Sequence, residues 1–190
     1  MLYTLWNKVY NKEFLTDHQI IFSDAAMGQD TRFNLEVYPY VSKVQLVKEP
    51  YYNYVKGRSD SSTTKHRENR TDLQLEEVKL LEDVLEKFDQ KEDILIKNIK
   101  RNILLENSHR IAESELSKKR KIALIARILS KEDFKEVIFG KKETESLSLR
   151  LFKKRRIKTY LALKTIKSYL LNIGLLMSTL KKEENHGSSQ

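Results

Sequence analysis

The chain has 190 residues, no cysteine and a net charge of +9. The missing cysteines exclude disulfides, thiolate metal sites and cysteine nucleophiles, while the length is sufficient for one or two domains with a buried core. Only five glycines and two prolines occur, which favours long helices joined by few turns. We recognise no signal peptide and no apolar run of about 20 residues, so we expect an intracellular protein (cytoplasmic, nucleoid-associated or nuclear) without a transmembrane segment.

The first 57 residues differ in composition from the rest and predict a small β or α/β region. Phe33, Leu35 and Val37 alternate with polar residues, which is the period-two pattern of a half-buried strand. The segment Val44–Val47 predicts a second strand that pairs with the first. Residues 58–71 are polar throughout and offer no apolar anchor, so we interpret them as a linker.

A mainly α domain, a bundle of long helices, is expected over residues 72–182. Its first helix shows apolar residues at spacings of three and four from Val78 to Phe88, and we expect it to continue to about Ser108. The next helix carries the stretch "LSKKRKIALIARIL", residues 116–129. The apolar side chains of this stretch predict one buried face, formed by Ile122, Ile125, Ala126 and Leu129.

The last helix is the clearest predicted element and is expected from Thr144 to Lys182. Its apolar residues alternate spacings of three and four, which predicts a helix-packing seam. The seam consists of Leu163, Ile166, Leu170, Ile173, Met177 and Leu180. The pattern suits packing within one chain and packing between chains equally well. Residues 183–190 are expected to be a disordered tail.

All the excess positive charge lies in the last 80 residues, where 19 basic side chains stand against 9 acidic ones. Such asymmetry indicates a polyanionic or acidic partner for this half of the chain, the alternative being a solvated lysine-rich surface. Four consecutive residues point all round a helix, so neither basic block places all its charges on one face. The residues expected to contact nucleic acid or an acidic partner are Lys118, Lys119, Arg120, Lys121, Arg127, Lys153, Lys154, Arg155 and Arg156.

Sequence signatures of catalysis and of cofactor or metal binding are missing. No glycine-rich phosphate loop and no H-E-x-x-H motif occur, and the four histidines are scattered along the chain. We therefore predict a protein that is not an enzyme, with no catalytic, cofactor-binding or metal-ligating residues. An enzymatic site would have to use the N-terminal residues His18, Asp24, Tyr51 and Tyr52, whose spacing gives it no support.

One pattern links the basic helix to a known family. The run "ENSHRIAESELSKKRKIALIARILSKEDFKEV", residues 106–137, resembles a segment of archaeal-type GINS proteins of DNA replication. The matching residues are Arg110, Lys118, Lys121, Ile122 and Arg127, followed by the segment Ser130–Glu136. "EPYYNYVKG", residues 49–57, is similar to the D-F-Y segment that precedes the helical domain in that family. The resemblance implies a non-catalytic scaffold subunit that assembles into a tetramer through helical interfaces and joins the MCM helicase to a RecJ-like partner.

Two functions follow as the main hypotheses. The first is a helical scaffold subunit of a DNA-replication assembly, which predicts a stable oligomer with protein partners. The second is a helical protein that binds DNA or RNA through phosphate contacts, such as a small subunit of an RNA-guided complex. Attachment of the basic C-terminal helix to anionic lipids is a further alternative.

Overall fold

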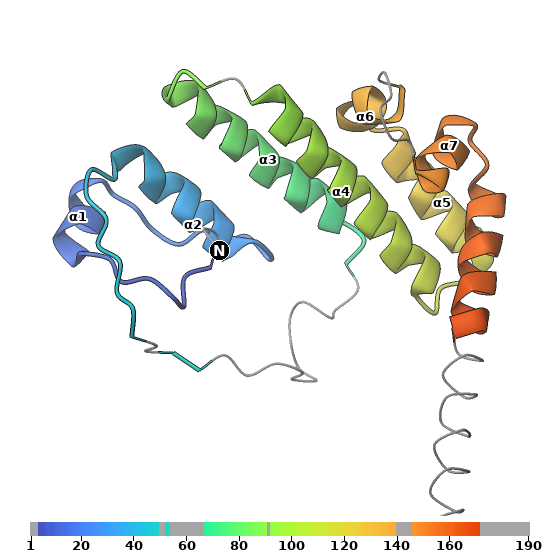
Figure 1. The fold of residues 1–190 in the computed structure, drawn as a ribbon, viewed down its shortest axis with the longest axis horizontal. Coiled ribbons are helices and arrows are strands. Elements are labelled where there is room, and N and C mark those ends of the chain that lie inside the picture. Colours follow the sequence, from blue (N-terminus) through green and yellow to red (C-terminus); the bar gives the residue numbers. More distant parts are fainter. Residues whose placement is uncertain (1–3, 50–51, 54–66, 91, 140–145, 172–190) are drawn as a thin grey trace, which may run out of the picture. The chain divides into compact units, whose positions relative to one another are not determined.

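The computed structural model describes residues 4–49, 52–53, 67–90, 92–139 and 146–171. All regular structure in these ranges is helical, so the prediction of a mainly α protein is confirmed there (Figure 1). Contacts divide the chain into two compact units, Met1–Ile103 and Leu104–Gln190, which are described in turn. The predicted division into residues 1–57, 58–71 and 72–182 stays a prediction, since most of the linker and the tail at 183–190 lie outside the described residues.

The first unit begins with α1 (Lys12–Asp17) and α2 (Gln29–Val37), and a short 3-10 helix, η1 (Tyr38–Tyr40), follows α2 directly. α1 starts where the side chain of Asn11 accepts a hydrogen bond from the Phe14 amide, which satisfies one of the unpaired N–H groups at a helix start. α3 (Arg70–Lys87) and the first half of α4 (Asp93–Glu113) complete this unit.

The predicted N-terminal β region is wrong for the described residues, which contain no strand. Phe33, Leu35 and Val37 lie on α2, and Asn34 is buried with them. The side-chain nitrogen of Asn34 donates to the Asp30 carbonyl at 2.8 Å, and its side-chain oxygen accepts from the Tyr10 hydroxyl at 2.6 Å. Because α2 is buried on most of its sides, its sequence shows no clear polar face. Its apolar residues alternate with polar ones, and this pattern was interpreted as that of a strand.

The second predicted strand is also wrong, because residues 41–49 have no regular structure and are exposed. Leu46, in the middle of that segment, is 89% exposed. A β-branched run of this kind forms a strand only where a neighbouring strand supplies hydrogen bonds and cover. The helices of this unit leave the segment without that support in the described part of the chain.

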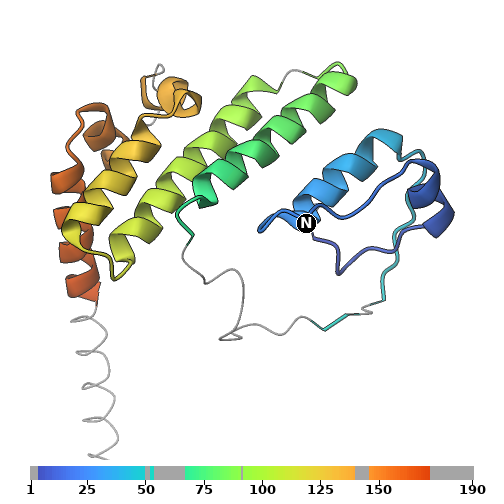
Figure 2. The ribbon, with the colours of Figure 1, turned by 180° about the vertical axis from the view of Figure 1, so that it is seen from behind.

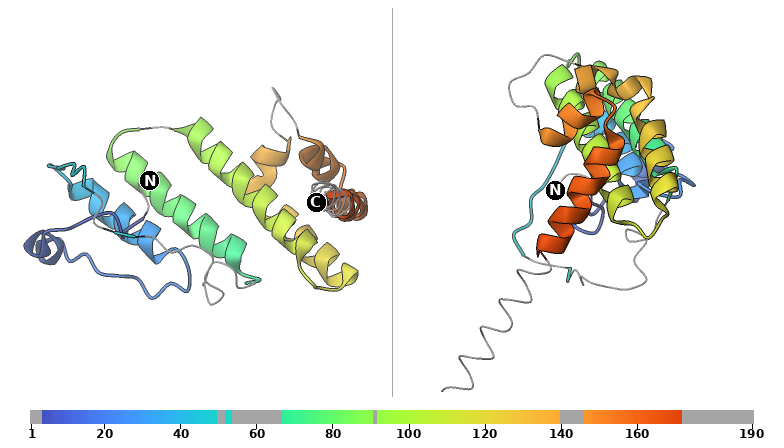
Figure 3. Two further views of the ribbon diagram at one scale, coloured as in Figure 1. Left: turned by 60° about the horizontal axis from the view of Figure 1, so that its bottom comes forward. Right: turned by 90° about the vertical axis from the view of Figure 1, so that its right-hand side faces the viewer.

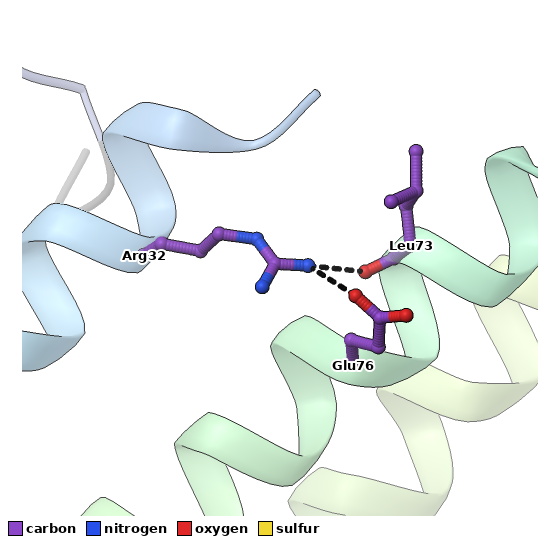
Figure 4. A network of polar contacts seen from close by, with 3 residues as sticks. All are labelled: Arg32, Leu73 and Glu76. Carbon is purple, nitrogen blue, oxygen red and sulfur yellow. Dashed lines mark hydrogen bonds and ion pairs between the residues drawn. The ribbon is translucent and has the colours of Figure 1, made fainter. Parts of the chain in front are cut away.

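A polar network fixes α2 against α3 in the first unit. The guanidinium of Arg32 donates to the Leu73 carbonyl at 3.3 Å and to the Glu76 carboxylate at 2.9 Å (Figure 4). The side chain of Arg32 is 13% exposed and that of Glu76 is 57% exposed, so solvent reaches the ion pair from the Glu76 side. The core beside it contains Ile20, Phe33 and Val37.

The long helix that was expected to continue to about Ser108 is two helices. α3 ends at Lys87, and Asp89 then takes a left-handed backbone conformation with φ of 53°. The Gln90 amide donates back to the Leu85 carbonyl at 2.9 Å, which is the six-to-one bond of a Schellman motif. α4 returns beside α3, and Lys100 pairs with Glu82 at 2.9 Å across the two helices.

The second unit consists of the last part of α4, α5 (Lys118–Leu129), a 3-10 helix η2 (Glu132–Phe134), α6 (Lys135–Phe139), α7 (Leu147–Lys153) and a helix over residues 157–171. Figure 2 shows α5 and the helix over 157–171 side by side, and Figure 3 (left) views the latter close to end-on. The core is formed by large side chains from several of these elements, and Phe134, Phe152, Leu104, Ile125 and Leu129 are its most deeply buried members.

The last helix predicted from Thr144 to Lys182 is interrupted. α7 ends at Lys153, and Arg155 has a left-handed φ of 53°. The Arg156 amide donates to the Leu151 carbonyl at 2.8 Å, again as in a Schellman motif. Residues 157–171 then form a separate helix, and the predicted seam residues Ile173, Met177 and Leu180 lie outside the described residues.

Candidate partner-binding surface

The first basic block opens α5. Ser117 caps this helix, its hydroxyl oxygen accepting from the Arg120 amide at 3.3 Å. The first turn then carries Lys118, Lys119 and Arg120, all exposed, and contains no acidic residue. Positive charge at a helix N-terminus opposes the helix dipole, so this arrangement costs stability. A local arrangement that opposes the fold in this way is typical of a functional site.

Lys121 differs from its three neighbours because its ammonium group is held in place. It donates to the carbonyl of Ala112, in the last turn of α4, at 2.8 Å. A cation at a helix C-terminus is favourable, and the bond satisfies one of the unpaired carbonyls there. The charge of Lys121 is thus fixed between the end of α4 and the start of α5.

The second basic block lies at the other end of α5. The guanidinium of Arg155 donates to the carbonyl of Leu129, the last residue of α5, at 3.2 Å. At 1.5 Å per residue, the two ends of α5 are about 16 Å apart. The structure therefore does not bring the two blocks into one cluster. Lys153, Lys154 and Arg156 are exposed near Arg155, and Arg127 is exposed on α5.

Acidic side chains are missing from the segments that carry these blocks. Residues 117–131 contain six basic and no acidic residues, and residues 146–171 contain eight basic and no acidic residues. Two acidic residues, Glu113 and Glu115, come shortly before α5 in the chain, and Glu113 pairs with His109 at 3.2 Å. The positive charge along α5 and the helix over 157–171 thus has no compensation from these segments themselves.

The helix over 157–171 packs on its unit with a face that differs from the predicted seam. Its buried residues are Ile157, Tyr160 and Leu161. Leu163 follows Leu161 by two residues, or about 200° around the axis, and so points to nearly the opposite side. Leu163, Ile166 and Leu170 are 41%, 55% and 62% exposed, and we call these three residues the exposed seam.

Tyr160 belongs to the packed face. Its ring lies 4.7 Å from that of Phe152, centroid to centroid, and the ammonium of Lys164 lies 5.7 Å from the Tyr160 centroid. Burial, with a smaller contribution from the negative charge of Glu113, raises the pKa of the Tyr160 hydroxyl far above its usual range. The hydroxyl is neutral at physiological pH, and Tyr160 serves as a packing residue.

A hollow of about 400 Å³ lies beside the exposed seam, within the second unit. The helix over 157–171 contributes Leu161, Ala162, Thr165 and Ile166 to its walls. Ala112, Lys118 and Lys121 form the opposite side. The hollow is partly open to solvent, and its walls are mostly apolar, with the two lysines as the charged groups.

Sequence reasoning missed this hollow and the second apolar face of the last helix. The predicted contact residues Lys118 and Lys121 line the hollow, as does the predicted seam residue Ile166. The signal that would have shown two faces is the closely spaced pair Leu161 and Leu163, which no single helical stripe can accommodate. Among the described residues, no group of three or more histidine or acidic side chains is placed to hold a metal ion.

No helix in the described part of the chain combines the length and apolar character that crossing a membrane requires. The chain matches no protein-family model, and no curated protein or solved structure is significantly similar to it.

Proposed function

We propose that the protein is a non-catalytic helical scaffold subunit of a DNA-replication assembly of the GINS type, linking a helicase to partner proteins. The observation that carries the proposal is the exposed seam. Leu163, Ile166 and Leu170 recur at the spacing of a helix-packing face and are exposed, whereas the helix packs on its own unit at its start, through Ile157, Tyr160 and Leu161. Contiguous exposed apolar side chains of this kind mark protein–protein interfaces.

The sequence resemblance of residues 106–137 to archaeal-type GINS proteins supports the choice of assembly. Within that run, Lys118 and Lys121 lie on the hollow beside the exposed seam. The proposal expects an intracellular protein that works as one subunit of a larger complex. It also expects no chemical step to depend on this chain.

Affinity purification of the intact chain from its native host, with and without nuclease, tests this proposal. The expected result is a protein partner in fixed stoichiometry that remains after nuclease treatment. A chain that stays monomeric at micromolar concentration, and retains no protein in fixed stoichiometry, would contradict it.

Direct nucleic-acid binding is the second candidate function, and the acid-free segments 117–131 and 146–171 favour it. If about six phosphates are neutralised on duplex DNA, log K should fall with log salt with a slope near −5. Because the two basic blocks are about 16 Å apart, replacing each block by alanine should flatten the slope separately. Unchanged slopes in both variants would remove this candidate.

A further inference from the structure

We propose that the exposed seam and the adjoining hollow bind an acidic amphipathic helix from another protein. This inference rests on the proposed scaffold function and names the chemistry of the partner. The apolar anchors of the partner helix would lie on the seam and in the hollow, and its carboxylates would face the lysines at the start of α5. A helix that lays its apolar face into such a groove is a recurrent mode of recognition.

The apolar part of the surface has the dimensions of a helix contact. The seam extends from Leu163 to Leu170, seven residues or about 10 Å along the axis, which is close to two helical turns. Ile166 belongs both to the seam and to the wall of the hollow, so the two features are continuous. An anchor side chain entering the hollow would meet Leu161 and Ala162 on one side and Ala112 on the other.

The charged part of the surface selects an acidic partner. Lys118 and Lys121 line the hollow, and the bond from Lys121 to the Ala112 carbonyl holds the ammonium in position before any partner arrives. A carboxylate beside this helix start would also be favoured by the dipole of α5, which the basic first turn now opposes. Fixed charges that need no rearrangement on binding favour affinity and specificity.

Two other occupants fit this surface less well. A second copy that docked through this same surface would bring acid-free, basic segments together, and like charges across an interface repel each other. Nucleic acid would satisfy the lysines but not the apolar side chains of the seam, which have no counterpart on a phosphate backbone. An acidic amphipathic helix complements both features at once.

The test uses a displayed library of helical peptides, with leucine fixed at spacings of three and four and glutamate, glutamine or lysine at all other positions. The target is the purified full chain, and the expected selection is for glutamate. Binding of the selected peptides is then measured by fluorescence anisotropy to four variants, whose substituted residues are all exposed. Unchanged midpoints of thermal unfolding confirm that each variant is folded.

Two variants change the proposed site, and each has a matched control. Ile166→Ser should weaken peptide binding about tenfold, whereas Leu147→Ser removes an apolar side chain that is 60% exposed on α7 and should leave binding unchanged. Lys118→Glu should weaken binding about fivefold. Lys43→Glu makes the same charge change at an exposed residue of the first unit that does not line the hollow, so little change is expected.

Selection of lysine- or glutamine-rich peptides, or no selection at all, would overturn the inference. The same holds if the selected peptides bind the Ile166→Ser variant as tightly as the original chain, or if Lys43→Glu and Lys118→Glu weaken binding equally. Failure of this test with a nuclease-resistant partner still bound to the chain would leave the scaffold function standing. Failure of both experiments would reject the scaffold function as well.

Discussion

The two faces of the helix over 157–171 make a sharp prediction about stability. Leu161 is 6% exposed and Leu163 is 41% exposed, although they are two residues apart on the same helix. Replacing either residue by alanine removes the same atoms at a position of similar helix propensity. The difference between the two variants therefore reports which face is packed in the free chain.

The magnitudes follow from the buried fractions. Three buried methylene-sized groups contribute about 2.4 kcal/mol at about 0.8 kcal/mol each. Leu161→Ala loses nearly all of this and also leaves a cavity, so it should lower the free energy of unfolding by about 2.5–4 kcal/mol. Leu163 is 41% exposed, so only the buried remainder of its side chain contributes to stability, and Leu163→Ala should cost at most about 1.4 kcal/mol.

Urea unfolding of the intact chain, followed by circular dichroism at the helix band, measures both values. The midpoint for Leu161→Ala should lie clearly below that for Leu163→Ala, while the two slopes stay similar. If Leu163→Ala were the more damaging change, the seam would be the packed face within the chain. The exposed seam and the proposals built on it would then be refuted.

Three further predictions concern the first unit, whose unfolding can be followed by the fluorescence of Trp6, the only tryptophan of the chain. Gly28→Ala should destabilise this unit by about 1–2 kcal/mol, since Gly28 has φ of 78° and an added Cβ would meet the Glu77 carboxylate; an unchanged midpoint would contradict the left-handed conformation. Gln19→Gly should stabilise it by up to about 1 kcal/mol, since Gln19 has φ of 54°, and a loss of stability would argue against that backbone. Burial raises the pKa of Glu77, so the contribution of Glu77 to stability is most favourable below the ordinary carboxyl pKa and declines as pH rises through the raised pKa. The gain in unfolding midpoint from Glu77→Gln should therefore be larger at pH 7 than at pH 4, and equal gains would contradict the raised pKa.

The apolar face of α5 was predictable from the sequence because burial and helical period agree there. Ile125 and Leu129 are buried, and Ile122 and Ala126 are half-buried beside them. Leu124 and Ile128 are buried as well, so the packed face is wider than the prediction. Packing from several neighbouring elements explains the extra width, which the spacing of residues within one helix does not reveal.

The ends of the helices were not predictable, since three of them use no glycine. Gln19, Asp89 and Arg155 take the left-handed conformation that follows α1, α3 and α7. A left-handed backbone is unfavourable for any residue that has a Cβ atom, and glycine is the usual residue at such a helix end. With no glycine at these positions, the composition predicted helices longer than those observed. For Arg155, the guanidinium bond to the Leu129 carbonyl offsets part of that cost, and this bond depends on tertiary contact.

The position of the basic residues on the chain was clear, but their arrangement in space was not. The sequence showed both blocks within the last 80 residues, and the structure separates them by the length of α5. The hollow depends on how the end of α4 meets the last helix, which no spacing along the chain encodes. Residues far apart in sequence, Ala112 and Ile166, define it together.

The absence of cysteine from the chain allows a direct test of the central claim, that the seam is open in the free chain and covered in the assembly. Single cysteines are introduced as Leu163→Cys and, as the control on the packed face, Leu161→Cys. The rate of thiol labelling is then measured in the free chain and in the nuclease-treated complex. We expect fast labelling at position 163 in the free chain, strong protection there in the complex, and slow labelling at position 161 in both. Slow labelling at position 163 in the free chain, or equal rates there in the free chain and the complex, would contradict the claim.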